Sequence, residues 1–210
     1  MSSIEAVISD FGGVLTSPLL NSFRAFEDHS GISPAAFGEA LAAVAERSGE
    51  HPLAELERGR MSEEQFLGEL ARELSAQLDR EVDLGSFGEQ YFAQLEPNEE
   101  LIDFMRGLRE RGYQMALCTN NVKEWEARWR AMLPVDEIFG VVVDSAFVGT
   151  RKPERRIYEI TLERLGVDPA AALLVDDLGV NCAAARELGI HAIQFKSNEQ
   201  AIAEIEAALG

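Results

Sequence analysis

The second half of the sequence alternates between short apolar runs and longer segments with helical spacing, and this alternation restricts the possible folds more than any other feature. The runs that resemble strands are residues 6–9, 113–118, 141–143, 172–175 and 190–195. Between the later runs, apolar residues recur at the spacing of amphipathic helices. Strands separated by helices form a parallel sheet that helices cover on both faces. The sequence therefore predicts an α/β fold built on a doubly wound parallel sheet.

Residues 16–95 depart from this alternation, because they carry helix signals without a clear strand. Ser62 and Gln65 match a capping box ahead of an apolar helical stripe, and prolines stand near both ends of the block. We predict an inserted helical module over residues 16–95. The core would then consist of residues 1–15 and 96–210.

The charge balance argues against two classes of partner. The 210 residues contain 19 Lys and Arg against 37 Asp and Glu, which gives a formal net charge of -18. Such a surface repels nucleic-acid phosphates and anionic lipid headgroups, so we expect no nucleic-acid and no membrane partner. No apolar run approaches the roughly 20 residues of a membrane-spanning helix, and the first residues lack the basic segment of a secretory signal. Since Cys118 and Cys182 form no metal or redox spacing, we expect a cytoplasmic location.

Polar residues follow most of the predicted strands. In open parallel sheets, ligands bind beyond the carboxyl ends of the strands, so these residues are the candidates for chemistry. Taken singly, each has an ordinary explanation as a turn former, a helix cap or a solvated charge. An adjacent pair of aspartates after a buried run is different, because like charges held close resist ionising together unless a cation is present. The candidates are Asp10, Thr119, Asn120, Lys152, Asp176 and Asp177.

Together these residues supply the parts for phosphoryl transfer. Carboxylates that converge on one sheet edge can hold a hard divalent cation, for which Mg²⁺ is the usual choice beside a phosphate. Asp10 can act as metal ligand and nucleophile, and Thr119 can donate a hydrogen bond to the transferring oxygens. Lys152 supplies a fixed positive charge for the transition state.

The order of these motifs resembles that of the haloacid dehalogenase-like hydrolase superfamily. The motifs are Asp10-Phe-Gly-Gly-Val-Leu, Leu117-Cys-Thr-Asn, Lys152-Pro153 and Val175-Asp-Asp177 with Asn181. The resemblance covers the whole chain and places residues 16–95 where that superfamily has a helical cap. Residues 57–62 and 175–189 are most similar to the branch with glucose-1-phosphate phosphatases and the N-terminal phosphatase domain of soluble epoxide hydrolases.

This resemblance implies a phosphatase that acts on a small, anionic phosphorylated metabolite through an aspartyl-phosphate intermediate. Asp10 would be the nucleophile, and Thr119, Asn120 and Lys152 would contact the phosphoryl oxygens. Asn181 would support the metal site from behind, and the chain would be a monomer or a homodimer. The implied Mg²⁺ ligands are the side chains of Asp10, Asp176 and Asp177 and the backbone carbonyl of Gly12.

One residue departs from the pattern of the superfamily's phosphatases. They carry a second aspartate two residues after the nucleophile, which protonates the leaving group and then activates water, whereas this chain has Gly12. Losing a positioned acid and base costs about 10² to 10⁴ in rate. The resemblance therefore implies slow turnover or a preference for good leaving groups, such as aryl or acyl phosphates. His29, His51 and Glu57 in the helical module are the candidates for a replacement group.

Gly12 also keeps two other functions open. A 2-haloacid dehalogenase would use the same aspartate to displace halide, which leaves without a proton, although Asp176 and Asp177 would repel a carboxylate substrate. A catalytically silent relative could serve as a binding module, although such a module has no chemical need for the combination of Asp10, Thr119, Lys152 and Asp177.

Overall fold

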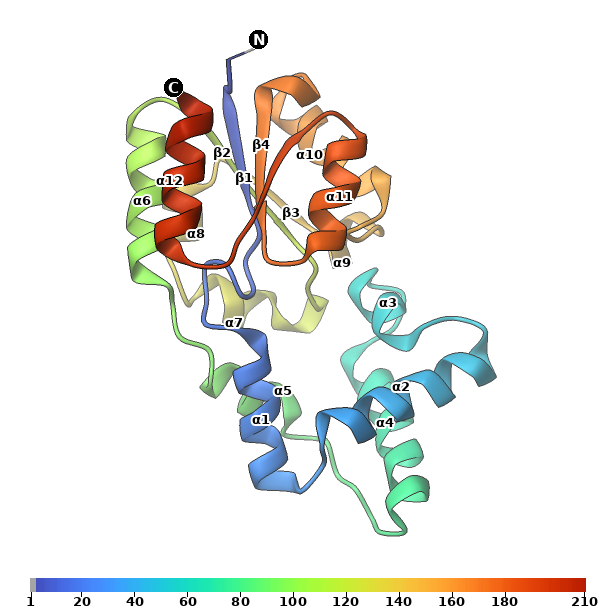
Figure 1. Cartoon of the computed structure of the whole chain (residues 1–210). Coiled ribbons are helices and arrows are strands. Elements are labelled where there is room, and N and C mark those ends of the chain that lie inside the picture. Colours follow the sequence, from blue (N-terminus) through green and yellow to red (C-terminus); the bar gives the residue numbers. More distant parts are fainter. Residues whose placement is uncertain (1–2) are drawn as a thin grey trace.

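The computed structural model describes residues 3–210 and contains a single sheet of parallel strands (Figure 1). The sheet has five strands in the order β3-β2-β1-β4-β5. The strands are β1 (Ala6–Ser9), β2 (Gln114–Thr119), β3 (Val141–Asp144), β4 (Ala172–Asp176) and β5 (His191–Gln194). The predicted α/β fold with a parallel sheet is confirmed, and each predicted strand matches an observed one to within two residues at either end.

Helices cover both faces of the sheet, as a buried parallel sheet requires. One face carries α6 (Glu99–Glu110), α8 (Val135–Ile138) and α12 (Asn198–Leu209), and the other carries α10 (Arg155–Leu165) and α11 (Gly179–Glu187). Successive strand residues point to opposite faces. In β1, Val7 packs in the core on the side of α6, whereas Ile8 packs in the core on the side of α10.

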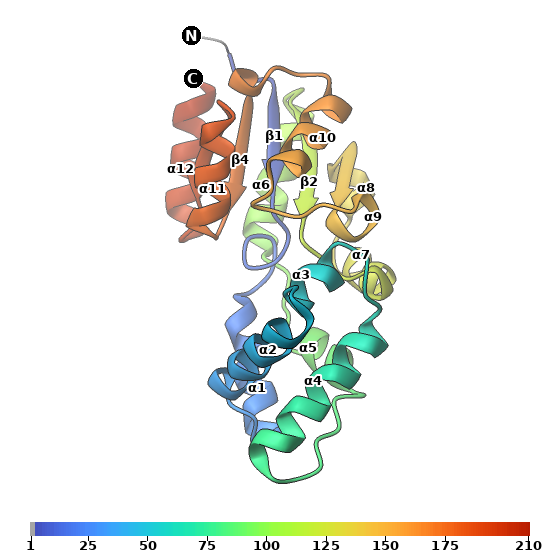
Figure 2. The same ribbon diagram turned by 90° about the vertical axis from the view of Figure 1, so that its right-hand side faces the viewer.

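The remaining long helices form a separate block beyond the carboxyl ends of the strands (Figure 2). They are α1 (Leu19–Ser30), α2 (Pro34–Ser48), α3 (Pro52–Glu57), α4 (Glu63–Leu78) and α5 (Phe87–Ala93). The block has its own apolar core, whose members include Phe26, Phe37, Leu70, Leu74 and Phe87. The chain enters and leaves the block side by side, at an antiparallel bridge between Thr16 and Pro97.

The predicted capping box at the start of α4 is present. The Gln65 amide N–H donates to Ser62 Oγ at 3.2 Å, and the Ser62 amide N–H donates to Gln65 Oε1 at 3.2 Å. These bonds satisfy donors that a helix N-terminus otherwise leaves unpaired.

The segment after β2 is not one continuous helix, although the apolar residues of 122–133 have helical spacing. It forms a 3₁₀ turn at Lys123–Trp125, then α7 (Glu126–Arg130), then a turn that leads into α8. Pro134 disfavours helical geometry in Leu133, so α7 and α8 cannot join into one regular helix. A short helix that the sequence did not predict, α9 (Ser145–Val148), follows β3. Across the part of the chain that the structure describes, no helix combines the length and apolar character needed to cross a bilayer.

Candidate functional site

The strand register brings the first aspartate beside the late acidic pair. Ser9 of β1 is level with Val175 of β4, so the next residues, Asp10 and Asp176, lie side by side where the two strands end. The Asp10 amide N–H donates to the Val175 carbonyl at 2.9 Å. From β1 the chain turns first to β2 and β3 on one side and later to β4 and β5 on the other. The site therefore lies at the point where the sheet order reverses, which is the usual ligand position in open α/β sheets.

Lys152 joins the two carboxylates. Its ammonium nitrogen lies 2.7 Å from Asp10 Oδ1 and 2.6 Å from Asp176 Oδ2, and its side chain is 1% exposed. Burial alone would lower the pKa of Lys152, but the charges of Asp10 and Asp176 raise it above its ordinary value. A buried charge needs such paired partners. Lys152 is therefore held as a fixed cation at the centre of the cluster.

The Asn120 side chain positions Lys152 from the neighbouring strand. Asn120 Oδ1 accepts from the Lys152 amide N–H at 2.8 Å, and Asn120 Nδ2 donates to the Lys152 carbonyl at 2.9 Å. Both polar groups of the Asn120 side-chain amide thus form hydrogen bonds with the Lys152 backbone. The expected contact of Asn120 with the substrate stays a prediction, and the amide geometry assigns its side chain to holding the lysine loop.

Asp176 is held rigidly by its neighbours. Asn181 Nδ2 donates to Asp176 Oδ1 at 2.9 Å, and the Leu178 amide N–H donates to the same oxygen at 2.9 Å. Asp176 is fully buried, and Asn181 is 2% exposed. Asn181 thus lies behind the acidic cluster, where it orients Asp176.

The acidic cluster has the geometry and charge to hold a divalent cation. One carboxylate oxygen each from Asp10, Asp176 and Asp177 lies within 4.8 Å of the other two. Burial raises the pKa of Asp10 to about 7 although Lys152 opposes the shift, and burial also raises the pKa of Asp177. Three carboxylates around one ammonium leave net negative charge in a buried place, and all the donors are oxygens. Such a set fits a hard cation such as Mg²⁺.

The glycine turn after Asp10 is shaped by its neighbours. Gly13 has φ +76°, and a Cβ there would lie 2.7 Å from Asp177 Oδ2, so no side chain fits between the turn and that carboxylate. At Gly12, a Cβ would lie 3.1 Å from the methyl groups of Leu19. Leu19 in α1 thus occupies the direction in which a side chain at position 12 would project.

A largely apolar cavity of about 380 Å³ opens beside this cluster, between the sheet edge and the helical block. Gly12, Thr119 and Asn120 line it from the sheet side. Thr119 is buried at the end of β2, where its side chain lies among the polar lining residues. The helices contribute almost only aliphatic and aromatic side chains, among them Leu20, Phe23, Phe37, Leu53, Phe87 and Tyr91.

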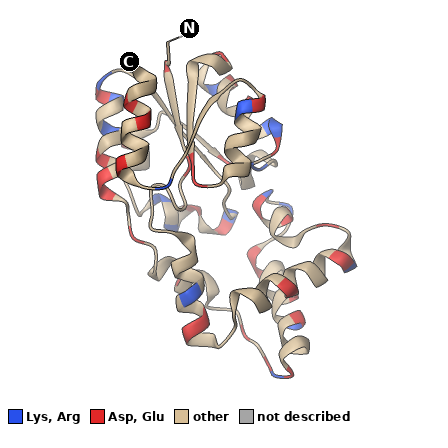
Figure 3. Ribbon diagram, in the orientation of Figure 1, with Lys and Arg blue, Asp and Glu red and all other residues tan. Residues whose placement is uncertain are grey.

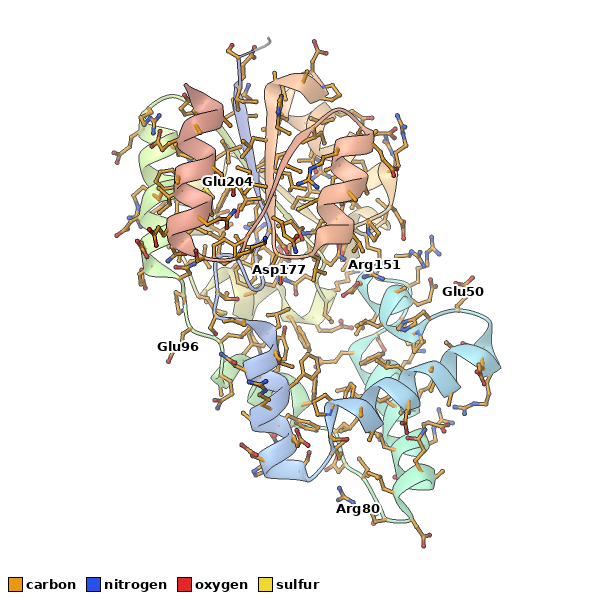
Figure 4. The ribbon with its side chains drawn as sticks, in the orientation of Figure 1. Glu50, Arg80, Glu96, Arg151, Asp177 and Glu204 are labelled. Carbon is orange, nitrogen blue, oxygen red and sulfur yellow. The ribbon has the colours of Figure 1, made fainter. Side chains whose placement is uncertain are left out.

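Of the three residues predicted as a replacement acid, only Glu57 lines this cavity. His29 and His51 are exposed on the helical block. Glu57 Oε2 lies 2.5 Å from Arg151 Nε, in the loop that leads to Lys152. Figure 4 shows Arg151 and Asp177 along the lower edge of the sheet layer, facing α3 and the rest of the block. Burial raises the pKa of Glu57 to about 6, against the opposing charge of Arg151.

Sequence reasoning missed the aromatic wall of the cavity. Tyr91 of α5 stacks on Trp125 with ring centroids 5.1 Å apart, and Phe37 of α2 stacks on Phe87 at 5.5 Å. These residues come from different helices and from the turn after β2. No local spacing connects them, so only the packing of the helices reveals that they share a surface.

The chain is similar to known proteins along nearly its whole length. The model of the hydrolase family described as haloacid dehalogenase-like hydrolase matches residues 4–189. Mouse acyl-CoA dehydrogenase family member 10 is 32% identical over 215 residues, which is 99% of this chain and 19% of the mouse protein. Rat bifunctional epoxide hydrolase 2 is 25% identical over 219 residues, 99% of this chain and 39% of the rat protein. The chain thus spans about a fifth and about two fifths of these relatives.

A relative of similar length and two solved structures extend this likeness. Phosphatase MT3486 of Mycobacterium tuberculosis (strain CDC 1551 / Oshkosh) is 32% identical over 196 residues, 88% of this chain and 86% of that protein. The structure of a predicted HAD-like family hydrolase from Porphyromonas gingivalis aligns with a TM-score of 0.75 and 26% identity over 99% of this chain and 98% of the other. A HAD family enzyme from Bacteroides thetaiotaomicron, in complex with magnesium and inorganic phosphate, has the same fold, with a TM-score of 0.66, 21% identity and coverage of 93% and 96%.

Proposed function

Because the chain belongs to the haloacid dehalogenase-like hydrolase family, we propose that it is a Mg²⁺-dependent phosphatase that hydrolyses a phosphate monoester through Asp10. The chain is a hydrolase by family, and the predicted resemblance to this superfamily is confirmed, the epoxide hydrolase relative included. The observation that carries the proposal is the convergence of Asp10, Asp176 and Asp177 around Lys152. A phosphatase relative of similar length and a magnesium- and phosphate-bound neighbour of the same fold support it.

In this proposal Asp10 attacks phosphorus and forms an aspartyl phosphate, which water then hydrolyses. Lys152 places its charge beside the attacking carboxylate, 2.7 Å from Asp10 Oδ1, and so offsets charge on the transferring oxygens. Thr119 donates a hydrogen bond to those oxygens from the end of β2. Asp10, Asp176, Asp177 and the Gly12 carbonyl would hold Mg²⁺. When bound, the ion would supply positive charge that favours ionised Asp10 and polarises the phosphoryl group.

The helical block is proposed as a cap over this site. Residues 16–95 would form the cap, and residues 1–15 and 96–210 the catalytic core. The bridge between Thr16 and Pro97 supports this division, since it brings the two crossings of the chain together. A cap in this position would exclude water and select the organic part of the substrate.

The decisive test replaces the nucleophile. Asp10→Asn keeps the shape of the side chain but removes the attacking carboxylate, so Mg²⁺-dependent phosphate release should fall on the order of 10⁴-fold or more. Asp103→Asn is the matched control, because Asp103 is an exposed residue of α6 that pairs with Arg106. Unchanged turnover by the Asp10 variant would refute the nucleophile assignment.

A dehalogenase remains the second candidate, favoured by the absence of an acid side chain at Gly12. Halide leaves carbon without needing a proton, so that chemistry tolerates glycine there. The test is chloride release from 2-haloacids in the presence of EDTA, measured beside phosphate release with Mg²⁺. Chloride release that persists in EDTA would replace the phosphatase proposal. Calorimetric titration that detects neither Mg²⁺ nor phosphate binding would instead indicate a silent binding module.

A further inference from the structure

Most of the side chains that line the cavity beside the acidic cluster are apolar. No Lys, Arg or His lines it among the residues that the structure describes, and Glu57 is its one carboxylate. Its aromatic members pack against one another, as in the stack of Tyr91 on Trp125. The indole nitrogen of Trp125 already donates to Glu63 Oε1 at 2.7 Å, so that donor is not free for a ligand. In the helical part of the wall, the Glu57 carboxylate and the Tyr91 hydroxyl are the polar side-chain groups, so most hydroxyl groups of a sugar would lack partners, at a cost in binding.

The cavity is also large enough to hold the organic part of a substrate. Its volume of about 380 Å³ lies within the range of roughly 300–1,000 Å³ that is usual for small-molecule sites. Gly12, Thr119 and Asn120 at its inner end adjoin Asp10 and the proposed phosphate position. Leu20 and Leu41 line it at the α1 and α2 walls. A phosphate group at the acidic cluster would therefore direct its ester substituent along an apolar surface.

We propose, resting on the phosphatase function above, that the substrate is a phosphate monoester with an uncharged apolar group, alkyl or aryl, which lies in this cavity. This specifies the substrate class that was expected from the sequence only as a small phosphorylated metabolite. The driving force is the transfer of apolar surface from water to the aromatic and aliphatic walls.

A series of n-alkyl phosphates from methyl to octyl phosphate tests the proposal. Each buried methylene group should raise kcat/KM roughly fourfold until the cavity is filled. Glucose 6-phosphate, which is similar in size but polar, should be a poor substrate. A flat response along the series, or a preference for the sugar phosphate, would overturn the assignment.

Variants on the cavity wall make the test specific. Leu41→Gln introduces an amide into the wall and should reduce the gain in kcat/KM per methylene group. Ala42→Gln is the matched control, since Ala42 is the next residue of α2 and is exposed. Equal slopes for Leu41→Gln and for the unmodified protein would contradict the proposed position of the alkyl chain.

Measurements of substrate binding test the cavity assignment independently of catalysis. Octyl and methyl phosphate are titrated calorimetrically against the Asp10→Asn protein with Mg²⁺. Tighter binding of octyl phosphate supports the cavity assignment even if the unmodified protein hydrolyses neither ester, in which case only the catalytic proposal falls. Equal affinity for the two esters rejects the cavity assignment whatever the catalytic result.

A second inference rests on a different observation, the way the end of α3 is fixed to the core. Glu57, Arg58 and Gly59 all contact the sheet layer in turn. Glu57 pairs with Arg151, and Arg58 Nη2 lies 2.5 Å from Glu154 Oε1. Gly59 fits so closely that a Cβ there would lie 2.1 Å from the Ala146 carbonyl oxygen. These contacts hold the Glu57 carboxylate in the cavity that also contains Gly12.

We infer that Glu57 carries out the proton transfers that the residue at position 12 cannot perform. The attacking and leaving oxygens lie roughly in line across phosphorus, so the leaving oxygen is on the cavity side, opposite Asp10. In the first step the Asp10 oxygen bonds to phosphorus, the ester P–O bond breaks toward its oxygen, and Glu57 gives that oxygen a proton. In the second step Glu57 takes a proton from water, whose oxygen bonds to phosphorus as the bond to Asp10 breaks. Phosphate leaves, and Asp10 and protonated Glu57 are regenerated.

The surroundings of Glu57 suit this exchange. Burial raises the pKa of Glu57 to about 6, while Arg151, Lys152 and Arg58 oppose the shift. Tyr91 of α5 lines the same cavity, and its pKa is raised by burial and then by the charge of Glu57. A carboxyl group with a pKa near the working pH can both give and take a proton.

The leaving group distinguishes a proton donor from a structural ion pair. Glu57→Gln should lower kcat for octyl phosphate about 10² to 10⁴-fold, but kcat for p-nitrophenyl phosphate less than about tenfold, since nitrophenolate leaves without a proton. Glu55→Gln is the matched control, because Glu55 pairs with Arg58 at 2.8 Å in the same helix but does not line the cavity. Equal loss on both esters, or no loss on either, overturns the inference.

Two further measurements complete the test. With octyl phosphate, kcat of the unmodified protein should fall above about pH 6 as Glu57 loses its proton, and this fall should be absent from the Glu57→Gln profile. Gly12→Asp, combined with Leu19→Ala to make room, should increase the octyl phosphate rate more in the Glu57→Gln protein than in the unmodified one. Equal gains in both backgrounds would contradict the inference, and an unmodified protein that hydrolyses neither ester would reject it together with the phosphatase function.

Discussion

At the scale of single residues, the site concentrates negative charge in a place that water reaches poorly. Asp10 is 7% exposed and Asp176 is fully buried, with Lys152 as the cation between them. The single positive charge of Lys152 can neutralise one of the two carboxylates but not both. The raised pKa of Asp10, about 7, expresses this imbalance. A bound cation or a proton can correct it, and the two should compete.

This imbalance makes the stability of the metal-free protein depend on pH. The pKa of Asp10 rises from 3.8 to about 7 on folding, so the folded state holds a proton that the unfolded state has already released. That contribution is complete below about pH 4 and is lost as the pH rises through about 7. The free energy of unfolding, measured with urea in EDTA, should therefore fall between pH 5 and pH 8.

Asp10→Asn isolates the effect. The variant cannot gain or lose this proton, so the fall in the free energy of unfolding between pH 5 and pH 8 should be smaller than in the unmodified protein by about 2–4 kcal/mol. Asp103→Asn on the exposed side of α6 should keep the original slope. If the Asp10 variant shows the same slope as the unmodified protein, Asp10 does not bind a proton in the folded state near neutral pH.

At the scale of elements, α3 is the piece of the helical block that meets the core most closely. Gly59 follows it with φ +66° and leaves no space for a Cβ against the Ala146 carbonyl. Gly49, after α2, has φ +79° and nothing within 4 Å of where its Cβ would lie. Alanine substitutions at Gly49 and Gly59 therefore distinguish two contributions to the free energy of unfolding. One is the strain of a left-handed backbone, and the other is the loss of the contact between the block and the core.

We predict unequal effects of alanine at these two glycines. Gly49→Ala should lower the free energy of unfolding by about 1–2 kcal/mol, the cost of the left-handed conformation alone. Gly59→Ala should lower it further and should also reduce kcat/KM, because α3 must move off Ala146 and carries Glu57 with it. Urea unfolding and steady-state kinetics on both variants check this. Equal losses of stability with unchanged kinetics would show that the α3 contact does not position the site.

The sequence predicted the elements whose signals are local. β1 and β4 could be recognised as apolar runs, and the convergence of Asp10 with Asp176 follows because neighbouring parallel strands end at the same edge. The capping box at Ser62 was also recognisable, since both partners lie within one turn.

Features that depend on packing could not be predicted in the same way. The bonds between Asn120 and the Lys152 backbone join residues 32 positions apart, and nothing in either local sequence indicates them. The stack of Tyr91 on Trp125 likewise arises only when α5 packs against the turn after β2. The pairing of Glu57 with Arg151 forms only when the helical block packs against the core, so the local sequence around either residue does not indicate it.

At the scale of the whole molecule, the acidic charge is spread over both the sheet layer and the helical block (Figure 3). The net charge of -18 surrounds a site whose proposed substrate is an anion. Long-range repulsion of this sign lowers the local concentration of the substrate. Salt screens such repulsion over about 10 Å at an ionic strength of 0.1 M.

We therefore expect kcat/KM to rise with ionic strength, in contrast to an enzyme that attracts its substrate with a basic cleft. Raising tetramethylammonium chloride from 20 to 200 mM at fixed Mg²⁺ should increase kcat/KM for an alkyl phosphate by roughly two- to fivefold. The initial rate at low substrate concentration is the measurement. A fall in kcat/KM would mean that the field of the site itself, with Lys152 at its centre, outweighs that of the surface.

The bridge between Thr16 and Pro97 brings the two covalent connections of the helical block together. The contacts at the end of α3 also attach the block to the core, so a movement about this connection would first have to separate Glu57 from Arg151 and Arg58 from Glu154. Such a swing would change the distance between Glu57 and Asp10 while the pairing of β1 with β4 stays intact. The cavity walls that the block contributes would then shift relative to the sheet, while Asp10 and Asp176 would stay level with each other at the ends of β1 and β4.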